Sequence, residues 1–222
     1  MDLIDDAEEI LKIASQLGFS NDADTQARLP APVQRLHRAV LRAFLDNGAP
    51  PALTWLREQA SKLSPDPDEA IARLAGADLV YAGEHGVTVA YPFSGAPTAH
   101  KVHPRGGRPV WAMCALDALG VLLMTRTDGT VSSSDPDTGT PIRVERRGGQ
   151  WQWQPADAVM LLAFTSASQP SAEGLCPQID FYQDAESARA HLNAHAGLVG
   201  EPVSQVTAVE LADRVYGPLL NE

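Results

Sequence analysis

The stretch Val110–Leu119 reads VWAMCALDAL, an apolar run that carries one thiol and one carboxylate. Pro109 favours a helix that begins nearby, and we expect the segment as far as Met124 to form a buried helix or a helix plus a strand. In a helix, Cys114 and Asp117 lie three residues apart on one face and can interact. The stretch therefore predicts a buried element that presents a thiol beside a carboxyl group.

The chemistry of this pair depends on protonation. A cysteine in the first or second turn of a helix is favoured as thiolate by the helix dipole. An ionised Asp117 opposes the Cys114 thiolate by charge, but it can also accept the proton of the thiol. Because its neighbours Trp111, Met113 and Leu116 are apolar, we expect a raised pKa for Asp117. A single cysteine in an apolar helix is more often only a small buried hydrophobe.

The second cysteine, Cys176, lies between two predicted strands, Val159–Phe164 and Ile179–Tyr182. A glycine and a proline flank it, and a loop of this composition can bring a thiol across a site. Taken alone, Cys176 is equally consistent with a loop thiol that has no function.

The chain beyond the first motif alternates short strands and helices. Turns rich in Asp, Pro and Gly separate the predicted strands 130–134, 142–145, 150–153, 159–164 and 179–182. Predicted helices cover Asp184–His195 and Ala208–Leu219. The segment 110–222 is therefore predicted to form a mixed α/β catalytic domain.

The first 91 residues are predicted to form a helical module. An amphipathic helix begins near Leu3 and stops near Gly18, and Asn21–Pro32 is predicted as a loop. Three helices and a hairpin follow, at about 33–47, 51–63, 66–74 and 79–91. This is the order of a winged helix. The predicted fold class is α+β, with a winged-helix-like three-helix module and β-hairpin (1–91), a linker (92–109) and the catalytic domain (110–222).

Composition excludes several function classes. The 222 residues carry a formal net charge of −11, which opposes binding to nucleic acid or to an anionic membrane. The predicted recognition helix also starts with the acidic run Asp66–Glu69. We find no apolar run of about 20 residues and no signal peptide. Two cysteines are too few for a disulfide framework, so we expect a cytoplasmic protein with two reduced thiols and neither a membrane nor a nucleic-acid partner.

Three segments, in order and at compatible spacing, resemble the organomercurial (alkylmercury) lyase family, the MerB-like proteins. The first is Trp111–Leu119, which is similar to the active-site motif of that family. The others are Thr130–Ser133 with Thr138–Pro141, and Leu175–Cys176 with Ile179–Tyr182 and the helix after them.

The resemblance implies an enzyme that cleaves a carbon–mercury bond to give a hydrocarbon and Hg(II). It implies that Cys114, Asp117 and Cys176 are catalytic and hold the mercury of substrate and product. The chemistry agrees, because thiolates suit a very soft metal and Asp117 can carry a proton from a cysteine to the leaving carbon. No cofactor is expected, since the mercury of the substrate is the electrophile. The implied partners are an organomercurial, small cellular thiols and a mercuric reductase that accepts Hg(II).

Two positions depart from the family pattern. Asp135 and Pro177 stand where some relatives have cysteines, and we expect these changes to bear on stability, metal retention or product release. The residues also leave other readings open: a soft-metal binding or sensing protein without turnover, or a winged-helix regulator that responds to metal.

Other groups of metal-binding or basic residues are weaker candidates. His100 and His103 have no third ligand nearby in the sequence, and His191 and His195 lie near the end of a helix, where histidine is common. A basic cluster on the strand near 142–147 is predicted to be a solvated strand end; it consists of Arg143, Arg146 and Arg147.

Overall fold

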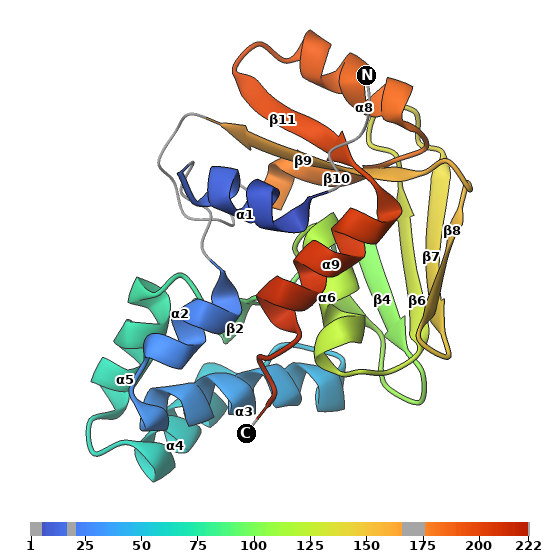
Figure 1. Ribbon diagram of the computed structural model, residues 1–222. Coiled ribbons are helices and arrows are strands. Elements are labelled where there is room, and N and C mark those ends of the chain that lie inside the picture. Colours follow the sequence, from blue (N-terminus) through green and yellow to red (C-terminus); the bar gives the residue numbers. More distant parts are fainter. Residues whose placement is uncertain (1–5, 17–20, 166–175, 222) are drawn as a thin grey trace.

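The computed structural model describes residues 6–16, 21–165 and 176–221 (Figure 1). The predicted helix stop at Gly18 and the residue Leu175 lie outside these ranges. No helix in the described part of the chain is both long enough and apolar enough to cross a membrane.

Within the described residues, the strands form two antiparallel sheets. The larger has the order β1-β2-β3-β5-β4-β6-β7-β8, and the smaller has the order β10-β9-β11. The strands of the larger sheet are β1 (Val80–Ala82), β2 (Val87–Ala90), β3 (Phe93–Ser94), β4 (His100–Pro104), β5 (Val110–Ala112), β6 (Gly129–Ser134), β7 (Pro141–Arg147) and β8 (Gln150–Gln154). Those of the smaller sheet are β9 (Val159–Thr165), β10 (Ile179–Tyr182) and β11 (Leu198–Val203).

The helices lie in three places around these sheets. Figure 1 shows α2 to α5 together at one end of the molecule, α6 and α9 side by side at its centre, and α8 against the smaller sheet. Their bounds are α1 (Ala7–Gln16), α2 (Asp22–Arg28), α3 (Ala31–Asn47), α4 (Leu53–Leu63), α5 (Pro67–Gly76), α6 (Ala115–Met124), α8 (Ala185–Ala194) and α9 (Gln205–Tyr216).

The mixed α+β class is confirmed, and local signals account for several of its elements. Helix α3 ends at Gly48, which adopts the left-handed conformation that favours glycine (φ 67°). Asp66 and Asp184 each cap a helix through a side-chain oxygen that accepts a backbone N–H. The order α3, α4, α5, β1, β2 matches the predicted three helices and hairpin. The winged-helix assignment and the division at residues 92–109 stay predictions.

The segment Asn21–Pro32, predicted as a loop, contains helix α2, so this prediction is wrong. The Asn21 side chain accepts from the N–H of Asp24 and donates to the carbonyl of Arg214 in α9. Gln26 likewise donates to the carbonyl of Leu219. Contacts with the distant C-terminal segment stabilise a short polar helix that its own composition does not favour.

The segment 92–109, predicted as a linker, contains two strands of the larger sheet, β3 and β4. Strand β4 alternates in burial, with His100, Val102 and Pro104 facing the core. Antiparallel partners on both sides, β5 and β6, hold it in the larger sheet. The sheet therefore continues from the hairpin β1-β2 through the predicted linker. Strand β11 was likewise not predicted.

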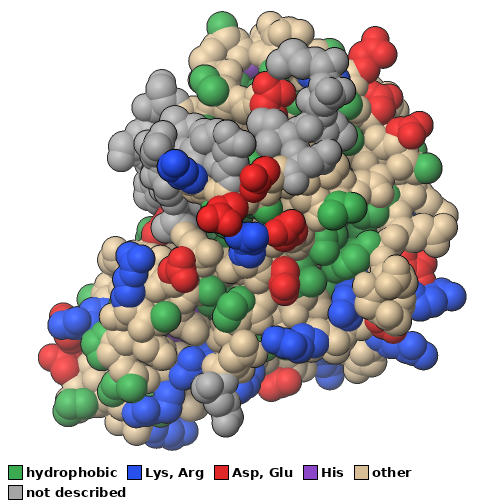
Figure 2. All heavy atoms as spheres, viewed as in Figure 1, with side chains coloured by type: hydrophobic (Ala, Val, Ile, Leu, Met, Phe, Trp, Pro, Cys, Tyr) green, Lys and Arg blue, Asp and Glu red, His purple; other side chains and the backbone are tan. Residues whose placement is uncertain are grey.

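The surface agrees with the acidic composition of the chain. Figure 2 shows several acidic side chains close together near the middle of one face, whereas the basic side chains on this face lie mainly toward its lower part. Between them are small apolar patches rather than one continuous apolar surface.

The packing of α6 on α9 gives a first prediction, because Gly120 allows the two helices to approach closely. A Cβ atom at Gly120 would lie 2.2 Å from the ring of Tyr216. We expect Gly120→Ala to lower the free energy of unfolding, since overpacking costs about 1–3 kcal/mol and alanine gains only about 1 kcal/mol over glycine in a helix. Urea denaturation measures the change.

Gly76 provides the matched control, since a Cβ there, at the end of α5, meets no atom within 4 Å. Gly76→Ala should leave stability unchanged or slightly raised. Equal unfolding midpoints for the two variants would contradict the close packing of α6 on α9.

Candidate active site

Cys114 is not inside a helix but caps the start of one. It follows strand β5 with an extended backbone, and its Sγ accepts a hydrogen bond from the N–H of Asp117, at 3.5 Å. The segment as far as Met124 thus contains a strand, β5, followed by a helix, α6, whereas the sequence predicted a helix alone or a helix plus a strand without their order. Because nearly all of α6 is buried, the helix fixes Asp117 in the interior, 0% exposed, directly beside the thiol.

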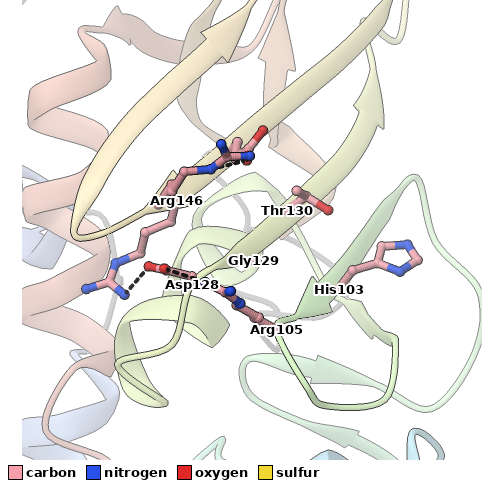
Figure 3. Close-up of a pocket in the computed structure, with 8 residues that line it drawn as sticks. His103, Arg105, Asp128, Gly129, Thr130 and Arg146 are labelled. Carbon is pink, nitrogen blue, oxygen red and sulfur yellow. Dashed lines mark hydrogen bonds and ion pairs between the residues drawn. The ribbon is translucent and has the colours of Figure 1, made fainter.

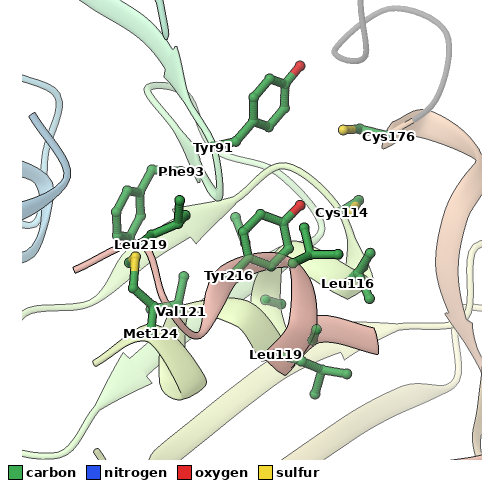
Figure 4. Packing of buried hydrophobic residues seen from close by; sticks show 14 of the residues in the cluster. Tyr91, Phe93, Cys114, Leu116, Leu119, Val121, Met124, Cys176, Tyr216 and Leu219 are labelled. Atoms are coloured by element: carbon green, nitrogen blue, oxygen red, sulfur yellow. The ribbon is translucent and has the colours of Figure 1, made fainter. Parts of the chain in front are cut away.

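Cys176 lies beside Cys114 and Asp117 but precedes a strand of the smaller sheet, β10. It opens the short 3-10 helix Cys176–Gln178, which runs directly into β10. The Cys114 thiol donates to Asp117 Oδ2 at 2.8 Å, and the Cys176 thiol approaches the same oxygen at 3.8 Å. Ligand atoms of the three residues all lie within 4.8 Å of one another, and Figure 4 shows both cysteines at one side of the buried cluster. Both cysteines are free thiols.

Burial controls the charge of Asp117 and raises its pKa to about 6. Hydrogen bonds from Cys114 and Tyr216, the charge of His100 and a hydrogen bond from Cys176 act in the opposite direction. The second oxygen, Oδ1, is buried and has no hydrogen-bond partner among the described residues. The raised pKa predicted from the apolar neighbours is confirmed, and it places the proton equilibrium of Asp117 close to neutral pH.

At Cys114, burial outweighs the effect of the helix dipole, and the predicted opposition of the Asp117 charge to the thiolate is confirmed. Burial raises the pKa of Cys114 well above its usual value, and hydrogen bonding with Cys176 and the charge of Asp117 add to this effect. For Cys176, a hydrogen bond with Cys114 favours the thiolate, but burial and the Asp117 charge outweigh it, so the pKa is raised. Near neutral pH the site therefore holds two thiols and one carboxylate that can accept a proton.

Three further polar residues, missed by the sequence analysis, lie around this group. Tyr216 of α9 lowers the pKa of Asp117. The Tyr91 hydroxyl and Asp22 Oδ2 are buried and have no hydrogen-bond partner within the described residues, and Figure 4 shows Tyr91 and Tyr216 near the two cysteines. Burial and the charges of Asp117 and Asp78 raise the pKa of Asp22. No motif marks these residues, because they come from three distant segments.

The histidine pairs are not metal sites in the described residues. His100 and His103 belong to opposite faces of β4, the first buried and the second partly exposed. The rings of His191 and His195 stack at 4.1 Å, and His191 Nδ1 lies 3.0 Å from Asp137. In the described part of the chain, the thiols and Asp117 form the one group of three such ligands.

Arg146 and Arg147 of the basic cluster line a surface cavity of about 500 Å³, which Arg143 does not line and which contains none of the three site residues (Figure 3). Its cations are paired internally: Asp128 lies 3.6 Å from both Arg105 and Arg146, and Glu145 lies 2.7 Å from Arg147. The cavity therefore offers little net positive charge to an anionic ligand. The chemistry of the molecule is concentrated in the buried site.

A buried pair of thiols that share one carboxylate defines a class of site suited to soft metals. The chain belongs to the alkylmercury lyase family: the model of that family matches residues 93–217, a range that includes Cys114, Asp117 and Cys176. The fold is similar to the crystal structure of the mercury-bound form of MerB2, with a TM-score of 0.72 and 21% identity over 90% of this chain and 99% of that one. No curated protein sequence matches the chain.

The electrostatics of Asp117 give a second prediction. The pKa of Asp117 is about 3.9 in the unfolded chain and about 6 in the folded protein. The unfolded chain therefore ionises first, and the free energy of unfolding falls as pH rises between these two values. Asp117→Asn should therefore raise the free energy of unfolding at pH 8 by about 1–3 kcal/mol, and this gain should shrink as pH falls below 6.

Urea denaturation of both proteins between pH 4 and 8 measures the difference. A carboxyl carbon NMR titration of the wild type provides the direct value. A titration midpoint at or below that of free aspartate would contradict the role of burial.

Proposed function

We propose that this protein cleaves the carbon–mercury bond of organomercurials by protonolysis, with Cys114 and Cys176 as mercury ligands and Asp117 as proton carrier. The observation that carries the proposal is the convergence of two sulfurs and one carboxylate, within 4.8 Å, in a buried site. Membership of the alkylmercury lyase family supports the same reaction.

The first step is thiol exchange. An organomercurial reaches the protein bound to a small cellular thiolate, and one cysteine thiol displaces that thiolate, which leaves with the proton as a free thiol. The mercury is then bonded to its carbon and to one cysteine sulfur. This exchange uses the preference of soft mercury for sulfur and needs no cofactor.

The second step uses the shared oxygen of Asp117. As the other cysteine binds mercury, its proton passes to the Asp117 carboxylate, since Oδ2 lies near both sulfurs, at 2.8 and 3.8 Å. Two thiolates increase the electron density at mercury and make the bound carbon more basic. Asp117 returns the proton to that carbon, the carbon–mercury bond breaks, and hydrocarbon leaves with Hg(II) on two sulfurs.

A pKa of about 6 suits a group that must both accept and return a proton near neutral pH. Burial excludes water that would otherwise compete as proton donor and acceptor. One thiol proton leaves in the first step and the other ends in the hydrocarbon, so the carboxylate is regenerated.

Product release and cellular context follow from the same chemistry. Two small thiols can exchange Hg(II) out of the site, or a mercuric reductase can accept it. We place the reaction in the cytoplasm, where thiols stay reduced. The N-terminal helices, winged-helix-like in order, then have a structural role: Asp22 and Tyr91 from this part of the chain help to enclose the site.

The same thiols could bind a soft metal without turnover, and Asp117 distinguishes the two functions. Asp117→Asn should lower the rate of hydrocarbon release by at least about 100-fold, because proton transfer by a positioned group contributes about that much. Binding of Hg(II) should persist, because both sulfurs remain. Benzene released from phenylmercury in excess small thiol, assayed by gas chromatography, measures the rate.

Asp137→Asn is the control, since Asp137 is partly exposed and pairs with His191 away from the site. It should react as the wild type does. Wild-type protein that binds Hg(II) but releases no benzene above the thiol-only background would replace the lyase with the metal-binding alternative. Full activity in Asp117→Asn would remove Asp117 from the mechanism.

A further inference from the structure

The two sulfurs of the site belong to different sheets. Cys114 follows β5 of the eight-stranded sheet, whereas Cys176 leads into β10 of the three-stranded sheet. The distance between the sulfurs therefore depends on the contacts that hold one sheet against the other. Apolar packing is non-directional, so a directional hydrogen bond between the sheets adds a constraint on their relative position.

A buried polar link of this kind joins the sheets at His100. This side chain of β4 is 3% exposed, and its Nε2 lies 3.0 Å from Asp180 Oδ1 in β10. Because a carboxylate oxygen only accepts, Nε2 carries the proton in this pair. The other nitrogen, Nδ1, lies 3.0 Å from the hydroxyl of Ser133 in β6. The ring also meets Phe181 edge to face, with centroids 5.8 Å apart.

The link lies close to both sulfurs along the chain. His100 is in register with Ala112 of β5, two residues before Cys114. Asp180 comes four residues after Cys176, one residue inside β10. The bond from His100 to Asp180 thus connects the strand beside the first cysteine to the strand that follows the second.

A second link holds the other end of β10. The buried Asp135, one of the two departures from the family pattern, accepts from the backbone N–H of Gln183 at 3.1 Å, and Thr140 donates to the Gln183 side chain at 2.8 Å. Because this link remains when His100 is changed, loss of the first link should displace the cysteine end of β10 and leave the sheets packed.

We propose that His100 is a positioning residue that, through Asp180, holds Cys176 at the distance from Cys114 at which both sulfurs reach one mercury. The proposal rests on the proposed function for its effect on turnover. A buried charge-assisted hydrogen bond is short and directional, and groups that orient metal ligands from behind typically affect metal affinity or activity by about 10–100-fold.

Two isosteric variants separate the two bonds of the ring. The amide nitrogen of His100→Gln can replace Nε2 and keep the bond to Asp180, whereas that of His100→Asn replaces Nδ1 and keeps only the bond to Ser133. We expect His100→Asn to lower kcat by about 10–100-fold with a smaller change in KM, because capture by the first thiol is unaffected. His100→Gln and Ser133→Ala should retain most of the activity.

Mercury L3-edge X-ray absorption of the Hg(II)-loaded proteins gives a readout that does not require turnover. Wild type and His100→Gln should show two sulfur neighbours, and His100→Asn should show one sulfur and a solvent ligand. His103→Gln is the matched control, because it changes the same residue type on the opposite face of β4. Asp180→Ala removes the same bond at its more exposed partner, so it should also show one sulfur and a solvent ligand. It provides the test if His100→Asn does not fold.

Two sulfur neighbours and wild-type kcat in both His100→Asn and Asp180→Ala would overturn the proposal. Equal loss of activity in His100→Asn and His100→Gln, in proportion to a fall in melting temperature, would also overturn it, because that is the result of a purely structural role. If the wild type has no lyase activity, the X-ray absorption result still tests the positioning role. Two sulfur neighbours in wild type and His100→Gln and one in His100→Asn would then support the role of His100 and refute only the proposed reaction.

Discussion

The site depends on one carboxylate oxygen shared by two buried thiols. Asp117 Oδ2 can be reached by the protons of both cysteines only because α6 begins at Cys114 and because β10 brings Cys176 to its side. Burial raises the pKa of Asp117 to about 6, and the same burial keeps both sulfurs protonated. Desolvation and shared hydrogen bonding together provide the group to which the proposed mechanism assigns proton transfer between sulfur and carbon.

The fold provides this arrangement by joining two sheets over one helix. Helix α6 packs between the sheets and against α9, whose Tyr216 lowers the pKa of Asp117. The N-terminal helices complete the enclosure, because Asp22 at the start of α2 is buried near Asp117. Residues from at least four segments thus exclude water from three reacting groups, and no single segment could do so.

Local signals in the sequence predicted local structure and little more. The helix that starts at the acidic run Asp66–Glu69 and a buried helix within 109–124 are predicted from neighbouring residues alone. Helix α2 and strand β4 were missed, because partners distant in sequence stabilise them. The net effect on the pKa of Cys114 could not be predicted for the same reason, since burial by distant segments outweighs the helix dipole. That Cys176 belongs with Cys114 was inferred from family resemblance, because 59 residues separate Asp117 from Cys176.

Raised thiol pKa values oppose the binding of any metal ion. They therefore make the site selective for metals that bind sulfur strongly. A metal must displace the proton of each cysteine that it binds, and here desolvation makes each proton harder to remove. Hard cations, which prefer oxygen, gain too little from sulfur to offset this cost. A very soft metal gains enough, and in the proposed mechanism Asp117 accepts one of the displaced protons within the site. The protonated resting state therefore favours a very soft metal over hard cations, and in the proposed mechanism it supplies the proton that the leaving carbon requires.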